Sequence, residues 1–421
     1  MKWKQVTLTL VGLTAGMGLI FSLVWNSQVN TSPSTASKVA TASPTKIDSA
    51  KETLPAYQTA AKKTLASMSE EDKLAQLLFV GVEGTTLSET ERNMIESGHV
   101  GGVVLLGRNV KNANQLNLLV SSIKEANQSP VPLFIGIDEE GGRVSRIPSS
   151  LSNLPSSERI GELNDKEISE QVGSVLARKV KHFGINMNFA PVLDINNNPA
   201  NEVIGDRSFG QTPAKVGNLG VATMQGIESE GIVPVIKHFP GHGDTSVDSH
   251  YKLPVIDKTV QQLESFEWKP FKQAIAAGAD VIMTAHILFP ALDDQYPATF
   301  SEKIIQGVLR EQLNYDGLVI TDDMAMGAIA NDYGTTEAAV RSVQAGADMV
   351  MLTDTRNGNF QNVHTALKQA VEQETVSLEQ VNESVERILQ TKQKYELNSP
   401  QEQVKEDELN EDISQIWEQI Q

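Results

Sequence analysis

Three of the seven histidines in this chain fall within one short segment. His238, His242 and His250 belong to the run K-H-F-P-G-H-G-D-T-S-V-D-S-H-Y, which also carries Asp244 and Asp248. Imidazole groups titrate near neutral pH, and a neighbouring carboxylate can fix the tautomer of an imidazole and support its protonated form. These residue types at this spacing therefore suit a site that moves protons.

The histidine-rich segment begins where a strand-like run, Ile232–Lys237, ends. Pro240, Gly241 and Gly243 exclude a regular helix after that run, so we expect an exposed turn at the end of a strand. Barrel enzymes keep catalytic groups on such turns. The two glycines also relieve backbone restrictions, which leads to the hypothesis of a mobile loop that carries His250 into and out of the site.

The elements that must position these groups are short apolar runs that alternate with helix-like stretches from about Ser67 to Leu397. The candidate strands are Leu77–Val82, Gly102–Leu106, Pro132–Asp138, Met187–Leu193, Val233–Lys237, Val281–His286, Gly317–Thr321 and Met349–Leu352. The helix-like stretches include Ala113–Asn127, Glu170–Phe183, Lys215–Ser229, Val260–Ala276 and Thr336–Ala345. This alternation predicts a single α/β domain, a (β/α)₈ TIM-type barrel. A doubly wound sheet is disfavoured because no glycine-rich phosphate turn follows an early strand.

Charged residues gather at the ends of five predicted strands or in the loops that follow them. They are Asp138, Arg143, Arg146, Asp206, Arg207, Lys237, His238, His286, Asp322 and Asp323. A single aspartate after a strand is usually a helix cap. Because the carboxyl ends of barrel strands share one mouth, the coincidence of five positions predicts a common site there.

The residues alone leave two chemistries open. Histidines and aspartates at barrel strand ends are common metal ligands, which allows metal-assisted hydrolysis. Alternatively, Asp322 is a nucleophile in a carboxylate-based group transfer, with a second group handling protons. The H-F-P-G-H run weakens the metal interpretation, since Pro and Gly prevent two histidines from lying one helical turn apart.

Four sequence blocks make a family resemblance specific: I-D-E-E-G-G-R-V-S-R, I-G-D-R-S-F-G, K-H-F-P-G-H-G-D-T-S-V-D-S-H and G-L-V-I-T-D-D-M. In this order they resemble glycoside hydrolase family 3, and within it the β-N-acetylhexosaminidases of the NagZ type. The D-S-H ending is what separates this subgroup from the β-glucosidase-like members, which resemble a two-domain design with a proton-donating carboxylate on the second domain. We see no second-domain pattern after the barrel region, which fits the histidine variant.

The resemblance implies roles for individual residues. Asp322 would be the nucleophile that forms a covalent glycosyl intermediate, His250 the general acid/base, and Asp248 the group that orients His250. The positions that match sugar-binding residues are Asp138, Arg146, Arg207, Lys237 and His238. Contact with substrate and a bracing salt bridge or hydrogen bond remain equally good interpretations for Arg143, Asp206, His242, Asp244 and His286.

The implied activity is that of a retaining exo-β-N-acetylglucosaminidase that acts on peptidoglycan fragments with a terminal GlcNAc linked to MurNAc. No metal or organic cofactor is implied, and we expect a monomer. Three alternatives stay open: a family 3 β-glycosidase of other sugar specificity, a non-catalytic sugar-binding protein of the cell wall, and a metal-dependent barrel hydrolase.

Composition excludes several other classes. The formal net charge of −18 argues against a nucleic-acid partner, because phosphate binding needs clustered Lys and Arg. The chain has no cysteine, which excludes a disulfide framework, thiol catalysis, thiolate metal sites and a lipid-modified N-terminus.

The termini predict a membrane-linked protein. Lys2 and Lys4 precede Val6–Trp25, an uncharged run of the length of a bilayer span, so residues 1–25 are interpreted as a signal anchor or a signal peptide. Residues 26–52 form a Ser/Thr/Pro-rich linker, 53–397 the family 3 barrel and 398–421 an acidic tail. We expect the barrel outside the cytoplasm, either anchored or secreted.

The acidic tail carries an apolar pattern with the period of a helix. Leu409, Ile413, Ile416 and Ile420 fall near one helical face, with Trp417 beside them. An amphipathic helix that lies on the barrel is the favoured interpretation, and a docking segment for a partner is the alternative.

Overall fold

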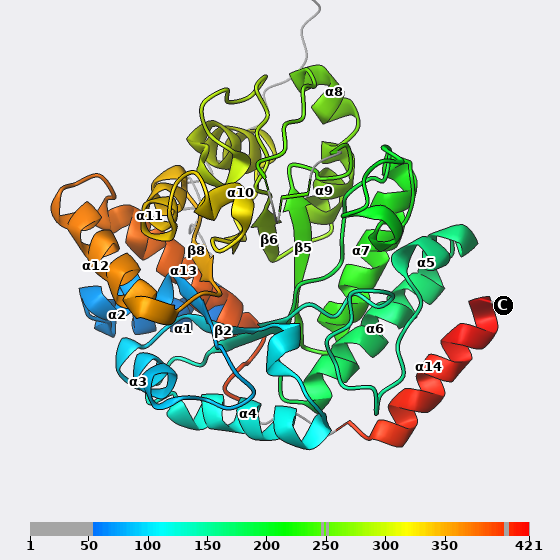
Figure 1. Ribbon diagram of the computed structural model, residues 1–421, viewed down its shortest axis with the longest axis horizontal. Coiled ribbons are helices and arrows are strands. Elements are labelled where there is room, and N and C mark those ends of the chain that lie inside the picture. Colours follow the sequence, from blue (N-terminus) through cyan, green and yellow to red (C-terminus); the bar gives the residue numbers. More distant parts are fainter. Residues whose placement is uncertain (1–53, 246–247, 250–251, 400–403, 421) are drawn as a thin grey trace, which may run out of the picture. The chain divides into compact units, whose positions relative to one another are not determined.

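The computed structural model describes residues 54–245, 248–249, 252–399 and 404–420. These residues belong to one compact unit, which begins at Leu54. Within it, eight parallel strands close into a barrel in sequence order, and the last strand pairs with the first (Figure 1). The predicted (β/α)₈ barrel is therefore confirmed. The predicted N-terminal span and linker, residues 1–25 and 26–52, lie outside the described residues.

The strands are β1 (Leu78–Gly81), β2 (Gly102–Leu105), β3 (Phe134–Ile137), β4 (Met187–Asn188), β5 (Val233–Phe239), β6 (Val281–Thr284), β7 (Leu318–Asp323) and β8 (Met349–Leu352). Their residues are buried apart from the last two of β7, as expected for parallel strands that are covered on both faces. Two strands run further than predicted: β5 continues to Phe239 and β7 to Asp323. His238 and Asp322 consequently lie on strands rather than in the loops that follow them.

Strand β4 is much shorter than the predicted Met187–Leu193. Pro191 has no backbone N–H to give to a ladder, so regular pairing cannot run through it. Beyond it, Val192 still forms an isolated parallel bridge with Lys237 of β5. The segment after β4 therefore stays beside β5 without being a regular strand.

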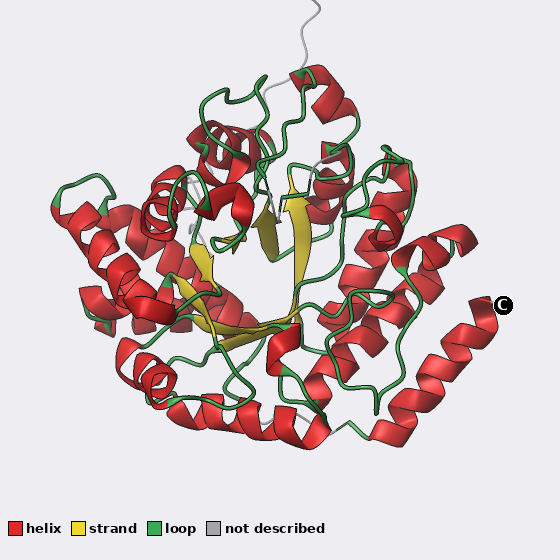
Figure 2. Cartoon of the chain, in the orientation of Figure 1, coloured by secondary structure: helices red, strands yellow, loops and turns green. Residues whose placement is uncertain are grey.

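The helices are α1 (Ala56–Ser67), α2 (Glu70–Gln76), α3 (Glu89–Gly98), α4 (Ala113–Ala126), α5 (Ser157–Leu163), α6 (Lys166–His182), α7 (Pro213–Ser229), α8 (Val260–Ser265), α9 (Trp268–Ala276), α10 (Gly327–Ala330), α11 (Thr335–Ala345), α12 (Asn359–Glu372), α13 (Leu378–Lys394) and α14 (Glu406–Ile420). Figure 2 shows these helices around the central strands. The single helix predicted for Val260–Ala276 was wrong. Phe266 leaves the helical region (φ −133°, ψ −78°), and a new helix starts at Trp268, which is buried.

The described residues contain no helix long and apolar enough to cross a membrane. In α14, the four residues of the predicted apolar face are buried: Leu409, Ile413, Ile416 and Ile420. The helix contacts α5 and α6 on the outside of the barrel (Figure 1).

Candidate functional site

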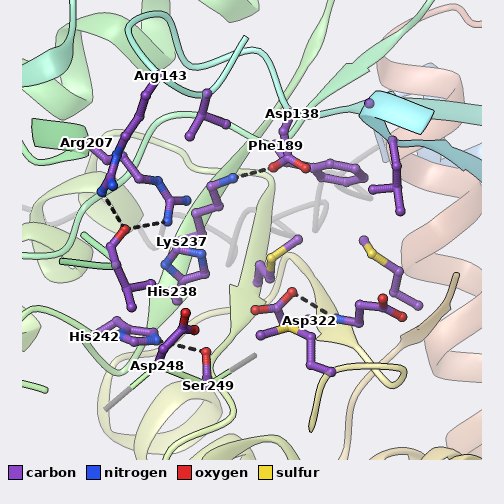
Figure 3. Close-up of a pocket in the computed structure, with 18 of the residues that line it drawn as sticks. Asp138, Arg143, Phe189, Arg207, Lys237, His238, His242, Asp248, Ser249 and Asp322 are labelled. Carbon is purple, nitrogen blue, oxygen red and sulfur yellow. Dashed lines mark hydrogen bonds and ion pairs between the residues drawn. The ribbon is translucent and has the colours of Figure 1, made fainter. Parts of the chain in front are cut away.

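A cavity of about 1100 Å³ opens at the carboxyl ends of the barrel strands. Figure 3 shows charged side chains from several strands directed into it. Seven of the eight predicted site residues line this cavity, namely Asp138, Arg146, Arg207, Lys237, His238, Asp248 and Asp322. The eighth, His250, lies outside the described residues, so its predicted role stays a prediction.

Lys237 supplies a buried cation at the centre of the cavity wall. Its side chain is 2% exposed, and its Nζ lies 2.6 Å from Asp138 Oδ1 and 2.6 Å from Glu140 Oε1. Burial alone would lower the pKa of this amine, but the charges of Asp138 and Glu140 outweigh burial and raise the pKa. The amine is therefore held in its charged form, with Asp138 oriented beside it.

Glu140 joins Lys237 to Arg207. The Arg207 guanidinium donates to Glu140 in a bidentate pair, Nε to Oε2 at 2.8 Å and Nη2 to Oε1 at 2.7 Å. Although burial opposes ionisation, the two cations hold the pKa of Glu140 far below its usual range. Glu140 was not predicted as a site residue. The available signal was a third acidic position directly after a strand in I-D-E-E-G-G, two residues beyond Asp138.

A second buried carboxylate, Asp194, organises the histidine-rich segment. Its Oδ2 accepts from His238 Nδ1 at 2.6 Å, and its Oδ1 accepts from the backbone N–H groups of His238 (3.2 Å) and His242 (2.7 Å). Burial opposes ionisation of Asp194, but His238 and the hydrogen bonds keep its pKa low. Asp194 was also missed, although it stands in the V-L-D-I-N run after β4.

The expectation of an exposed turn after β5 was wrong. His238 and His242 are 6% and 3% exposed, and the residues from Phe239 to Gly243 are buried. The physical reason is Asp194, because a fully buried carboxylate that accepts three hydrogen bonds draws this segment into the barrel mouth.

His242 connects this buried turn to the residue after Asp248. Its Nε2 lies 3.2 Å from Ser249 Oγ, and its Nδ1 lies 3.2 Å from Thr245 Oγ1. Burial, with the charge of His238, lowers the pKa of His242 to about 4, so the ring is neutral at pH 7. The Ser249 carbonyl also accepts from the backbone N–H of Ala328 at 3.0 Å. His242 therefore acts as a neutral brace for Ser249.

The two aspartates at the end of β7 have different environments. Both carboxylate oxygens of Asp323 accept hydrogen bonds from neighbouring residues. Its Oδ1 accepts from the N–H groups of Ala325 (3.1 Å) and Thr353 (3.0 Å), and its Oδ2 accepts from Thr353 Oγ1 (2.5 Å). Asp322 Oδ1 accepts from the backbone N–H of Asp323 at 2.8 Å, the one hydrogen bond to its side chain from the described residues. The Asp322 carboxylate lines the cavity, and among the described residues no hydrogen bond is made to its Oδ2.

The pKa values of these two carboxyl groups are shifted in opposite directions. Burial opposes ionisation of Asp322, but the electrostatic influence of His286 and His238 and the Asp323 N–H lower its pKa. Burial raises the pKa of Asp323 in spite of its hydrogen bonds. Asp322 is therefore the better anion. His286 is a brace near this strand end, with Nε2 2.9 Å from the Asp323 carbonyl oxygen.

Three residues for which substrate contact and a bracing salt bridge were equally good interpretations form salt bridges: Arg143, Asp206 and Asp244. Arg143 Nε lies 2.7 Å from Asp206 Oδ1, and Asp244 Oδ2 lies 2.6 Å from Lys258 Nζ. Arg143 still lines the cavity. Its Nη2 donates to the Val203 carbonyl at 2.8 Å, and the same carbonyl accepts from Arg207 Nη1 at 3.2 Å. Figure 3 shows Arg143 and Arg207 beside each other in the cavity wall.

The turn that carries Arg146 is fixed from below by a buried ion pair. Glu139 and Lys179 have fully buried side chains, and their charged atoms are 2.6 Å apart. Glu139 Oε2 also accepts from the backbone N–H groups of Arg146 (2.8 Å) and Ile147 (3.2 Å). Among the described residues no carboxylate pairs with the Arg146 guanidinium. Its donors are thus available to a ligand in the cavity.

The cavity suits a polar, uncharged ligand with many hydroxyl groups. Its walls offer carboxylate acceptors at Asp138 and Asp322 and cationic donors at Lys237 and Arg146. The described residues contain no group of three or more His, Asp or Glu arranged to hold a metal ion.

Comparisons with known proteins agree with this chemistry. The model of the glycosyl hydrolase family 3 N-terminal domain matches residues 69–391. The β-hexosaminidase of Nitrosomonas eutropha is 39% identical over 281 residues, which cover 65% of this chain and 80% of that relative.

Solved structures give the same picture. The glycoside hydrolase family 3 β-N-acetylglucosaminidase from Paenibacillus sp. str. FPU-7 superimposes with a TM-score of 0.78 at 38% identity, over 83% of this chain and 68% of that chain. LpqI of M. tuberculosis superimposes with a TM-score of 0.72 at 32% identity, over 78% of this chain and 95% of that chain.

Proposed function

The chain belongs to glycosyl hydrolase family 3 and is a glycoside hydrolase of the β-N-acetylhexosaminidase type, and from this premise we propose that it releases terminal GlcNAc from peptidoglycan fragments with retention of configuration. The observation that carries the mechanism is the contrast within the T-D-D pair. Asp322 is an ionised carboxylate with an oxygen open to the cavity, whereas the oxygens of Asp323 accept from Ala325 and Thr353. An available carboxylate at this position can act as a nucleophile.

In the first step, Asp322 attacks the anomeric carbon of the bound sugar. The bond to the leaving oxygen breaks, its electron pair stays on that oxygen, and His250 as general acid supplies the proton. In the second step, a water molecule gives a proton to His250 and attacks the anomeric carbon, which breaks the glycosyl–Asp322 bond. Two inversions give overall retention.

Asp248 is the proposed partner of His250 in proton transfer. It lines the cavity, and the next residue, Ser249, is held by His242 and by the backbone of Ala328. A carboxylate beside an imidazole fixes the tautomer and stabilises the protonated form. The pair would thus be anchored on a braced segment.

The residues opposite the nucleophile are the proposed sugar-binding groups. Asp138 accepts from sugar hydroxyls while Lys237 holds it in place, and Arg146 donates to ring substituents. Arg207 and His238 complete this set, positioned by Glu140 and Asp194. Such paired groups keep their orientation before the sugar arrives.

Trapping the intermediate tests the nucleophile. A fluorinated GlcNAc analogue that forms the glycosyl-enzyme quickly and hydrolyses slowly should label Asp322, as read by peptide mass spectrometry. Label on Asp323 or Asp248 instead would overturn the assignment.

Substrate choice is tested separately on residues 53–421. We expect hydrolysis of a chromogenic β-GlcNAc substrate and of a GlcNAc–MurNAc fragment. The corresponding chromogenic β-glucoside should be turned over at least about 10²-fold more slowly, because it lacks the N-acetyl group that the site is proposed to bind. A chain that prefers β-glucose, or that ignores the GlcNAc–MurNAc fragment, would contradict the peptidoglycan proposal.

We also propose that the enzyme works outside the cytoplasm, tethered by its N-terminal segment. The support is the uncharged run Val6–Trp25, preceded by Lys2 and Lys4. The full-length protein should fractionate with membranes and be cut by protease added from outside. A soluble extracellular form that starts within residues 26–52 would show cleavage and remove the tether from the proposal.

A further inference from the structure

Helix α14 begins after residue 391, where the family match ends, and packs beside α5 and α6. Figure 1 shows it in red at the outer edge of the barrel. Its four aliphatic residues are buried, and Asp412 forms an ion pair with Arg178 of α6. This side of α14 anchors the helix to the barrel.

A different side of α14 holds the backbone of the loop between β3 and α5. The Asn410 side chain accepts from the N–H of Ser152 at 2.8 Å and donates to the carbonyl of Ser150 at 3.0 Å. The indole Nε1 of Trp417 donates to the carbonyl of Asn153 at 3.0 Å. Residues seven apart lie on the same face of a helix, so these two side chains grip one loop segment, residues 150–153, together.

This loop segment forms hydrogen bonds to the turn at Gly141 and Gly142, at the start of the same loop, which we call the glycine turn. Asn153 Nδ2 donates to the carbonyl of Gly142 at 2.6 Å, and the N–H of Gly142 donates to the carbonyl of Leu154 at 2.9 Å. Gly142 has a positive φ of 54°, and a Cβ there would lie 2.8 Å from the Cβ of Ser156. The turn is therefore tightly packed against the segment that α14 holds.

The glycine turn leads directly to two arginines of the cavity. Arg143 follows Gly142, and Arg146 comes three residues later; both line the cavity. Arg143 also shares the Val203 carbonyl with Arg207. A displacement of the turn would consequently move the donor groups of both arginines.

We propose that α14 is a positioning element for substrate binding, in which Asn410 and Trp417 fix the place of Arg143 and Arg146 through the segment 150–153. The inference rests on the proposed sugar-binding role of Arg146. Neither Asn410 nor Trp417 lines the cavity, so both act through the loop. The nucleophile Asp322 is on β7 and is not part of this chain of contacts, so the effect should fall on binding rather than on chemistry.

The test uses the full chain with the double substitution Asn410→Ala and Trp417→Phe. With a nitrophenyl β-GlcNAc substrate, we expect KM to rise about tenfold and kcat to stay within about twofold, because ground-state and transition-state contacts to Arg146 weaken together. Gln415→Ala is the matched control: Gln415 is exposed on the same helix, and its side chain makes no hydrogen bond to the described residues. Its KM should equal that of the unchanged protein.

Hydrogen exchange supplies a readout that does not depend on activity. Amides in peptides that cover residues 141–153 should exchange faster in the double variant and not in Gln415→Ala. If the double variant folds poorly, Trp417→Phe alone keeps an aromatic ring and removes the indole donor, and the faster exchange is still expected. Unchanged KM and unchanged exchange in a folded variant would overturn the proposal.

A separate substitution distinguishes this inference from the function on which it rests. Arg146→Ala should raise KM by itself. If it does not, the sugar-binding role of Arg146 fails. Faster exchange without a change in KM would overturn the positioning role of α14 and leave only a structural one.

Discussion

Two lysines with buried amino groups lie at opposite ends of the barrel. At the carboxyl ends of the strands, Lys237 Nζ stands between Asp138 and Glu140 at 2.6 Å from each. Burial opposes the charge there, but the two carboxylates raise the pKa. The cavity end of the barrel thus keeps a permanent cation in a place with almost no solvent.

At the other end of the barrel, the buried lysine Lys392 has neutral partners. Lys392 of α13 donates to Gln76 Oε1 and to the Gly101 carbonyl, each at 2.8 Å, and its Nζ lies 4.9 Å from the centre of the Phe134 ring. With no carboxylate beside it among the described residues, burial lowers its pKa well below the usual value.

The difference shows how the barrel separates function from stability. Of these two lysines, the one with carboxylates beside it keeps its charge, and it lies at the end with the cavity. At the N-terminal end the lysine is satisfied by neutral oxygens, as expected for the end of a barrel that carries stability rather than catalysis.

The largest expected effect is at the cavity end. Asp322→Ala should lower kcat at least about 10³-fold, because covalent catalysis loses its attacking group. Steady-state assays together with a thermal unfolding curve measure it. Asp323→Asn is the paired variant: its losses should appear in stability, since its partners are Thr353 and Ala325. Equal kcat losses with equal stability in both variants would contradict the assignment.

Replacing each buried lysine in turn tests the comparison directly. Lys237→Met should lower kcat/KM about 10²-fold and the free energy of unfolding by about 3–5 kcal/mol, because Asp138 and Glu140 lose their shared cation. Lys392→Met should leave kcat/KM within about twofold and cost about 1–3 kcal/mol, because two buried oxygens lose their donor. Kinetics and urea unfolding of both variants check this. A loss of activity in Lys392→Met would break the division between the two ends.

His242 is a neutral ring beside the charged groups of the cavity. Its folded pKa of about 4 lies below the unfolded value of 6.5, so the unfolded state binds the proton first as pH falls. The stability from the neutral ring is present above pH 6.5 and is lost as pH falls from 6.5 to about 4. The difference of 2.5 units corresponds to about 3 kcal/mol at about 1.36 kcal/mol per unit.

Urea unfolding across this range measures the effect. His242→Asn carries no titrating ring, so its free energy of unfolding should fall less between pH 6.5 and 4 than that of the unchanged protein. Parallel pH profiles for the two proteins would show that His242 does not titrate as expected.

The smallest effect is expected in the alkaline range, where the two lysines should act with opposite signs. The pKa of Lys392 is lowered on folding, so its contribution to stability should grow as pH rises towards the unfolded value of 10.5, relative to Lys392→Met. The pKa of Lys237 is raised on folding, so its contribution should stay constant up to 10.5 and decrease only above it. Slopes of the same sign for both lysines would show that the two ends are electrically alike.

The fold could be predicted because the strands of a parallel barrel are buried on both faces and read as apolar runs. The predictions that were wrong concern the bounds of individual strands and helices. The sequence shows Pro191 but not that pairing would stop so early, and it gives no sign that Phe266 would divide one helix into two. Strand ends at Phe239 and Asp323 depend on neighbouring strands, which a local pattern does not contain.

The cavity residues could be predicted in part for the same reason, since strand ends converge in any barrel. The pairing between them could not. Glu140 and Asp194 are the buried carboxylates that orient Lys237, Arg207 and His238, and their importance lies in distances that exist only after the barrel closes. A sequence shows which groups carry charge, whereas the packed structure decides which charge faces which.

Gly243 stands at the closest approach of two loops of the cavity. A Cβ at this position would lie 1.7 Å from the carbonyl oxygen of Ile195, so the backbone is wedged there rather than freed by the glycine. The absence of a side chain at Gly243 permits a close contact with Ile195, and the predicted mobility of the loop stays a prediction. A backbone position with such a close contact is not suited to act as a hinge. Gly243 therefore fixes the backbone just before the segment that carries Asp248.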